Sequence, residues 1–259
     1  MDVGFVDLTL GRGHVGEQMR SFRFWLTWIA WSVLAFMTFP VWIWAYGQIV
    51  PAGSHGDTYA ALAAIFTLFA FVGIVVALHT QRTDADVQNA RSEFFQLIGV
   101  WQEVVHNTVY NPETGRQAFH KMSHELSAHM NANLLSRSQD AVIAAEDIQK
   151  TYAVFYFMGV SEPLGHYFRL LYNIVRFVDE ERVLGRAEKE RLIRIVRALI
   201  SEPEFNLLFW NGLSEYGKEK FHPLIDKYDL LQNFLFNGIK DNVLRLYPIT
   251  FARQNRLRS

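Results

Sequence analysis

Two stretches of the sequence decide how this chain is organised: residues 24–46 (FWLTWIAWSVLAFMTFPVWIWAY) and residues 59–78 (YAALAAIFTLFAFVGIVVAL). Neither stretch contains an Asp, Glu, Lys or Arg. A helix of about 20 apolar residues spans the roughly 30 Å hydrocarbon core of a bilayer. The two stretches therefore predict a transmembrane hairpin over residues 24–80, with the lipid bilayer as a partner.

The charges that flank the two spans predict their orientation. Three arginines precede the first span and Arg82 follows the second, whereas residues 47–58 contain no Lys or Arg. Because Lys and Arg accumulate on the cytoplasmic side of membrane helices, both termini are predicted to be cytoplasmic. Residues 1–23 then form a short cytoplasmic segment.

Small residues recur along the second span. Ala60 with Ala64, and Gly73 with Ala77, repeat a four-residue spacing that lets helix backbones approach closely. This spacing fits packing on the first span and equally fits packing on another copy of the chain. Since two spans cannot enclose a pore alone, we expect a homo-oligomer.

The composition excludes several kinds of chemistry. The 259 residues include no cysteine, which rules out disulfides, thiolate catalysis and cysteine-based zinc sites. The formal net charge of −1 argues against a nucleic-acid partner. No cofactor is predicted.

The sequence after the hairpin predicts an all-α fold. Apolar residues recur at three- and four-residue intervals almost throughout, and no alternating strand pattern occurs. We expect an amphipathic connector helix over residues 81–110 and a helical cytoplasmic domain over residues 111–259. Ser201 and Glu204 form a capping box at one helix start. The domain's other expected helices cover residues 116–135, 141–157, 161–180, 192–199, 205–213, 224–231 and 233–246.

Two features near the end of the chain have alternative interpretations. Gly212 is expected at the end of a helix, where a C-cap is favoured over contact with a ligand. Arg245, Arg253, Arg256 and Arg258 form a basic tail that lies either on anionic headgroups or free in solvent.

Several separated motifs resemble one family, in order and in spacing. They are EFFQLI (93–98), GRQAF (115–119), GHYFRLLY (165–172), LLFWNGLS (207–214) and GKEKF (217–221). Over residues 92–236 the chain resembles the phage abortive infection protein family (AbiC-like). The resemblance implies a membrane hairpin, a helical cytoplasmic domain, a bacterial inner-membrane location, and defence that kills or arrests the infected cell. The binding or family-motif positions that it indicates are Arg116, His166, Arg169, Tyr172, Asn211, Gly212 and Lys218.

A ribonuclease site is the first catalytic hypothesis. Helical ribonuclease toxins use an Arg and a His on one helix to polarise a phosphodiester and activate the 2′-hydroxyl. No histidine here has an Arg before it at the required spacing, but His166 and Arg169 carry the two groups in reversed order. Ion pairing of Arg169 and packing of His166 are the structural alternative.

A metal site is the second chemical hypothesis. His120 and His124 are spaced to share one helix face, with Glu125 or His129 as further ligands. Lys121 stands where a zinc protease needs Glu, so a metalloprotease is excluded. Two solvated histidines are the favoured interpretation.

Three functions remain open at this point. The first is an antiphage effector whose cytoplasmic domain senses a phage or host protein and whose oligomerised hairpin perturbs the membrane. The second is a ribonuclease-type toxin tethered to the membrane, and the third is a non-enzymatic sensor or adaptor.

Overall fold

The computed structural model describes residues 55–135, 143–236 and 239–258. The first predicted span lies outside these ranges, as does the segment before it. The chain divides into two compact units, residues 1–78 and residues 79–259.

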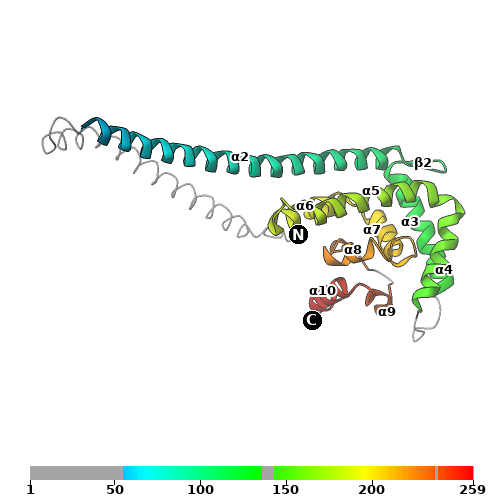
Figure 1. The fold of residues 1–259 in the computed structure, drawn as a ribbon. Coiled ribbons are helices and arrows are strands. Elements are labelled where there is room, and N and C mark those ends of the chain that lie inside the picture. Colours follow the sequence, from blue (N-terminus) through cyan, green and yellow to red (C-terminus); the bar gives the residue numbers. More distant parts are fainter. Residues whose placement is uncertain (1–54, 136–142, 237–238, 259) are drawn as a thin grey trace, which may run out of the picture. The chain divides into compact units, whose positions relative to one another are not determined.

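Helix α2 (His55–Asn107) is one uninterrupted helix (Figure 1). It contains the second predicted span and most of the predicted connector, so the two are parts of the same helix, which ends at Asn107. Among the described residues, α2 is a helix long and apolar enough to cross a bilayer by length and composition. Residues 63–78 of it are all exposed.

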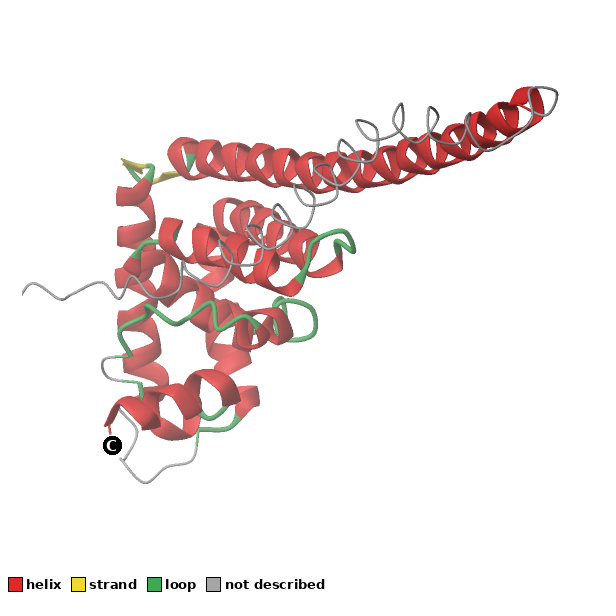
Figure 2. Cartoon of the chain, turned by 90° about the vertical axis from the view of Figure 1, so that its left-hand side faces the viewer, coloured by secondary structure: helices red, strands yellow, loops and turns green. Residues whose placement is uncertain are grey.

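A small β-hairpin follows α2. Strand β1 (Val109–Tyr110) pairs antiparallel with β2 (Glu113–Thr114), and Val109 lies opposite Thr114. The sequence predicts a turn here but no strands. The rest of the described chain is helix and loop, which confirms the all-α class (Figure 2).

The domain's remaining helices largely follow the predicted segments. In chain order they are α3 (Arg116–Met130), the π-helical turn η2 (Asn131–Leu135), α4 (Ala145–Phe155), the π-helical turn η3 (Tyr156–Val160), α5 (Ser161–Glu180), α6 (Arg186–Leu199), α7 (Glu202–Leu213), α8 (His222–Lys227), α9 (Asp241–Leu244) and α10 (Pro248–Arg258).

Predictions for the last 30 residues are partly wrong. The helix expected over residues 233–246 is reduced to α9, and α10 forms where a tail was expected. Arg253 of α10 donates from Nε to Asp229 Oδ2 at 2.7 Å, and only 15% of its side chain is exposed. It therefore packs on the domain, because Asp229 and the carbonyls of Leu231 and Gln232 satisfy its guanidinium.

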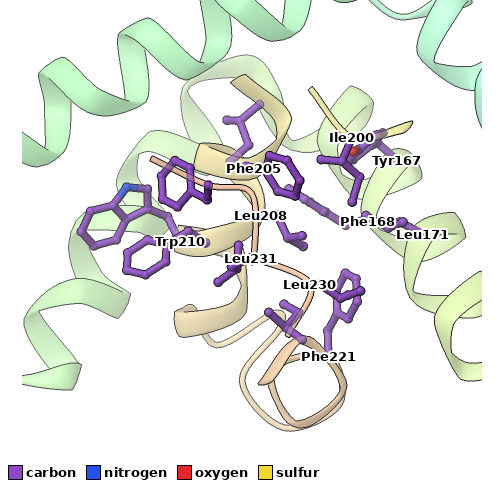
Figure 3. Close-up of a cluster of buried hydrophobic side chains, with 14 of the residues drawn as sticks. Tyr167, Phe168, Leu171, Ile200, Phe205, Leu208, Trp210, Phe221, Leu230 and Leu231 are labelled. Atoms are coloured by element: carbon purple, nitrogen blue, oxygen red, sulfur yellow. The ribbon is translucent and has the colours of Figure 1, made fainter. Parts of the chain in front are cut away.

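Helix α7 lies in the core of the domain. Its nine residues from Phe205 to Leu213 are buried except Asn206, and apolar residues of α5 and of the segment after α8 surround it (Figure 3). The predicted capping box is confirmed, since the Ser201 N–H donates to Glu204 Oε2 at 2.8 Å. Burying each large apolar side chain contributes roughly 1.5–3 kcal/mol, so α7 organises the helices around it.

Candidate functional site

Several of the family-motif residues gather around one cavity of about 620 Å³, here called the Arg169 cavity. Its walls come from η3, α5, the end of α7 and the turn that follows α7. The aromatic residues that line it are Tyr156, Phe168, Tyr172, Tyr216 and Phe221. The other lining residues are Ser161, Gly165, Arg169, Asn173, Asn211, Gly217 and Lys220.

One wall depends on a kink between α4 and α5. Gly159 has a φ of +108°, a conformation that glycine adopts without strain, and the chain changes direction there. The Tyr156 hydroxyl spans the kink and donates to the Ser161 carbonyl at 3.0 Å. A Cβ on Gly165 would lie 2.7 Å from that hydroxyl. The glycine of the GHYFR motif therefore leaves the space that the Tyr156 hydroxyl occupies.

The opposite wall is the turn after α7. The Ser214 hydroxyl donates to the Asn211 carbonyl at 2.6 Å and closes the end of the helix. A Cβ on Gly217 would lie 2.4 Å from the same carbonyl oxygen. Gly217 therefore allows the chain to fold back tightly, which places Tyr216 and Lys220 on the cavity wall.

A stack of aromatic rings leads from the core to the surface beside the cavity. Tyr152 stacks on Tyr156 at 6.0 Å between ring centroids, and Tyr156 stacks on Tyr216 at 4.5 Å. Tyr152 is fully buried, and its hydroxyl accepts a hydrogen bond from Asn211 Nδ2 at 3.3 Å. Tyr216 at the other end is 41% exposed. The stack thus has a fixed inner end and an open outer ring.

The electrostatics of the cavity favour an anion. Arg169 and Lys220 line it, and no Asp or Glu does. Arg169 donates from Nε to the Gly165 carbonyl at 3.0 Å, which orients its guanidinium. Neither cation forms an ion pair with an acid in the described part of the chain.

The Tyr156 and Tyr216 hydroxyls stay protonated at neutral pH. Burial raises the pKa of Tyr156, although the nearby Arg169 charge acts in the opposite direction. Burial and then the neighbouring Glu215 carboxylate raise the pKa of Tyr216. Both hydroxyls are therefore neutral hydrogen-bonding groups; Tyr156 is near the Arg169 charge, and Tyr216 is near the Glu215 carboxylate.

The candidate catalytic pair lies on a neighbouring groove of about 820 Å³, here called the His166 groove. His166 and Arg169 both line it, so the structure does bring these two side chains to one surface. Glu103 and Glu162 line the same groove. Arg169 contributes to the walls of both the groove and the Arg169 cavity.

Four of the seven family-motif positions do not line the Arg169 cavity, and one of them, His166, lines the His166 groove instead. Arg116 donates from Nη1 to Glu204 Oε2 at 3.1 Å and from Nη2 to the Leu199 carbonyl at 3.1 Å, so it fastens α3 to the start of α7. Lys218 is exposed outside the cavity. Lys220 lines the cavity instead, although the sequence did not single it out. Its only signal in the sequence is the GKEKF motif, which also contains Lys218.

Gly212 is not a C-cap. It lies inside α7 and is buried, and the helix continues to Leu213 with Ser214 as its cap. A Cβ at Gly212 would lie 2.2 Å from the Tyr247 hydroxyl, which donates to the Phe209 carbonyl at 2.9 Å. Close approach of Tyr247 is therefore the reason for the glycine.

The metal hypothesis finds no geometry to support it in the part of the chain that the structure describes, where no group of three metal-ligating side chains occurs. His120 and His124 line a separate cavity of about 430 Å³. Glu125 accepts a hydrogen bond from the Tyr110 hydroxyl at 2.6 Å, and burial together with this bond raises the pKa of Tyr110 to about 12. His129 Nε2 is bonded to the Thr151 carbonyl, so both expected extra ligands are engaged elsewhere.

Comparison with known families places this cavity in a recognised segment. Residues 159–239 match the family described as "Putative phage abortive infection protein". Apart from Tyr156, all residues that line the Arg169 cavity lie in this abortive infection segment. The match confirms the family resemblance seen in the motifs from GHYFRLLY onward and supports a role in phage defence.

The match begins after the EFFQLI and GRQAF motifs, whose resemblance stays a prediction. No curated protein and no solved structure matches the chain.

Proposed function

We propose that this protein is a membrane-anchored phage-defence effector. Its helical domain detects infection, and its apolar helices, brought together from several copies, perturb the inner membrane. The abortive infection segment supports the defence role. Anchoring, assembly and mechanism are our proposal.

The observation that carries the proposal is the continuity of α2. Phe94 and Trp101, in the carboxyl-terminal half of this helix, are fully buried in the domain. Residues 63–78 of the same helix carry no charge and are exposed, as expected of a helix that faces lipid. Because one helix contains both parts, a shift of its buried half changes the orientation of its apolar half.

The second span has the features of an assembling helix. Gly73 is exposed, and a Cβ built on it would meet no atom within 4 Å. With Ala77 one turn later, it offers a flat strip on which a second helix packs closely. Since this span carries no charge, a conducting path between several copies would be apolar or would arise from disordered lipid.

A tethered ribonuclease is the second candidate function. It is favoured by the placement of His166 and Arg169 on one groove, with both groups available to a phosphodiester. The carboxylates of Glu103 and Glu162 on the same groove repel a phosphate, which places this function second.

Membrane potential during infection distinguishes the two functions. Cells that express the intact chain are challenged with phage in the presence of a potential-sensitive dye. We expect protection to coincide with depolarisation, Leu68→Arg to abolish both, and His166→Ala to leave both unchanged. Protection without depolarisation, lost in His166→Ala together with RNA cleavage, would establish the ribonuclease instead.

The role of helix continuity has its own test at Ala85, an exposed residue of α2. Proline in a helix interior removes a hydrogen bond and kinks the helix, at a cost of about 3 kcal/mol. We expect Ala85→Pro to remain in the membrane with a folded domain and to lose protection, whereas the control Ala85→Ser protects. Equal protection by both variants would show that the two halves of α2 act independently.

A further inference from the structure

We propose that the Arg169 cavity binds a nucleotide, that is, a ligand with a planar base and at least one phosphate. The inference rests on the proposed function, because it identifies the signal that the helical domain detects. It assigns that signal to a small molecule, where the sequence led us to expect a phage or host protein. Charge, ring geometry, free polar groups and size support it.

The charge of the cavity selects for phosphate. Arg169 and Lys220 contribute two positive charges without a carboxylate on the walls. By contrast, the His166 groove and the cavities lined by His120 and by Lys189 each include at least one Asp or Glu among their lining residues. Arg169 is held through Nε by the Gly165 carbonyl, which leaves both terminal nitrogens for a bidentate contact with phosphate oxygens.

The aromatic stack offers a place for the base. The Tyr156 ring stacks on the Tyr216 ring, and the planes of the two rings are inclined by only 28°. Tyr216 remains 41% exposed. Phe157 stands edge-on to Tyr216 at 6.3 Å and is 71% exposed. A base that stacks on Tyr216 extends an existing row of rings and covers apolar surface that water now contacts.

Two amide side chains provide unused hydrogen-bonding groups. The Asn173 side chain makes no hydrogen bond with the described residues, although the residue lines the cavity. Asn211 uses Nδ2 on Tyr152, and its Oδ1 accepts no hydrogen bond from the described part of the chain. Asn211 is only 4% exposed, so this oxygen is suited to a donor on a ligand that enters the cavity.

The size of the cavity indicates a small nucleotide. Its volume of about 620 Å³ lies within the roughly 300–1,000 Å³ of small-molecule pockets. A single-stranded polynucleotide needs a positively charged groove that follows the backbone over several nucleotides. Two cations at one cavity do not form such a groove.

Direct binding of labelled nucleotides tests the proposal. The full chain in detergent is incubated with each of the four ribonucleoside triphosphates, and bound label is separated by filtration. We expect saturable binding of at least one of them in the micromolar range. Unlabelled nucleotide should compete at least tenfold better than the matching nucleoside or inorganic phosphate. The nucleoside lacks the phosphate, and inorganic phosphate lacks the base.

Matched variants locate the site. We expect Arg169→Ala and Lys220→Ala each to weaken binding about tenfold or more, since each removes a charge-assisted contact. Tyr216→Ala should weaken binding and Tyr216→Phe should not. The control is Arg176→Ala, on the same helix, because Arg176 pairs with Glu180 at 2.8 Å and does not line the cavity.

Several outcomes would overturn the proposal. Folded chain that binds no triphosphate up to about 1 mM, or binds it equally well in Arg169→Ala and Lys220→Ala, excludes a nucleotide at this cavity. The proposal is also overturned if the chain binds single-stranded RNA more tightly than it binds any triphosphate and these variants do not weaken RNA binding. The proposed function fails separately, when the intact chain shows no depolarisation in phage-challenged cells, whether or not nucleotides bind.

Discussion

The two halves of α2 belong to one helix and differ in the surroundings that their side chains require. Residues 63–78 are apolar on every side, and all of them are exposed. In the other half, Phe94, Ile98, Trp101 and Val105 form a buried stripe, while the exposed residues include Glu93, Gln96 and Glu103 as well as Phe95 and Val100. A helix that is apolar all round needs a non-aqueous environment, whereas a helix with one apolar stripe needs only one packed face. The comparison shows that one continuous helix combines a half suited to a non-aqueous environment with a half that packs in a domain surrounded by water.

The largest difference between the halves is expected when one aromatic residue is removed from each. Trp101 is fully buried and Phe69 is 68% exposed. Trp101→Ala should lower the free energy of unfolding of the domain by about 3–5 kcal/mol, because it leaves a cavity. Phe69→Ala should change it by less than about 0.5 kcal/mol, because it removes no packing in the domain. Urea unfolding followed by circular dichroism measures both, and equal losses would mean that residues 63–78 also pack in the domain.

A charge placed in each half tests the environment of residues 63–78. Leu68→Arg should reduce membrane insertion by about 2.5–3.5 kcal/mol, the cost of an arginine near the centre of a span. Asn89→Arg is the control, since Asn89 is an exposed residue of the domain half. Carbonate extraction of membranes measures the shift into the soluble fraction. Unchanged retention of Leu68→Arg would contradict a lipid-facing helix.

Acid should affect the domain and not the apolar half. Burial alone would raise the pKa of Asp179, but hydrogen bonds from Lys227 and Tyr228 outweigh it, so its pKa lies below the usual value. Such a group stabilises the fold above its unfolded pKa of about 3.9, and this contribution is lost as the pH falls through the folded pKa. We expect Asp179→Asn to lower the free energy of unfolding by about 1–2 kcal/mol near neutral pH.

The difference between Asp179→Asn and wild type should shrink below about pH 3 in urea unfolding. Residues 63–78 contain no titratable side chain, so flotation of the chain with lipid vesicles should not change over the same range. If wild type remains more stable than Asp179→Asn by the same free energy of unfolding in acid, the effect of the substitution is due to packing.

The smallest effect concerns two threonines with the same local hydrogen bond. Thr67 donates to the Ala63 carbonyl at 2.8 Å, and Thr108, just after α2, donates to the Val104 carbonyl at 2.7 Å. Thr108 is 7% exposed, so Thr108→Val should cost the domain about 0.5–1.5 kcal/mol. Thr67→Val should leave domain unfolding unchanged. Equal costs in urea unfolding would contradict the separation of the two halves.

Local patterns in the sequence predicted most of the helices. The capping box at Ser201 was correct because it depends on a few neighbouring residues. The helix expected over residues 233–246 and the free tail were wrong because contacts distant in sequence decided both. Arg253 is an example, since its carboxylate partner Asp229 lies 24 residues earlier.

The Arg169 cavity could be predicted only in part. Arg169, Tyr172 and Asn211 were recognised from motifs, but nothing in the spacing of residues indicated that Tyr156 and Tyr216 would stack. The glycines gave the strongest missed signal. Gly165 and Gly217 are required by close approach of atoms from other segments, and a sequence shows the residue without the atom that approaches it.

The sequence by itself determined the apolar, uncharged runs, the helical class of the domain and the abortive infection motifs, because hydropathy, periodicity and motif order are properties of the chain read in one dimension. Only the tertiary structure decided that the second run continues unbroken into a helix of the domain core. It alone also brought α5 and the turn after α7 together around Arg169 and Lys220, which form no ion pair within the described residues, because packing in three dimensions determines which side chains meet.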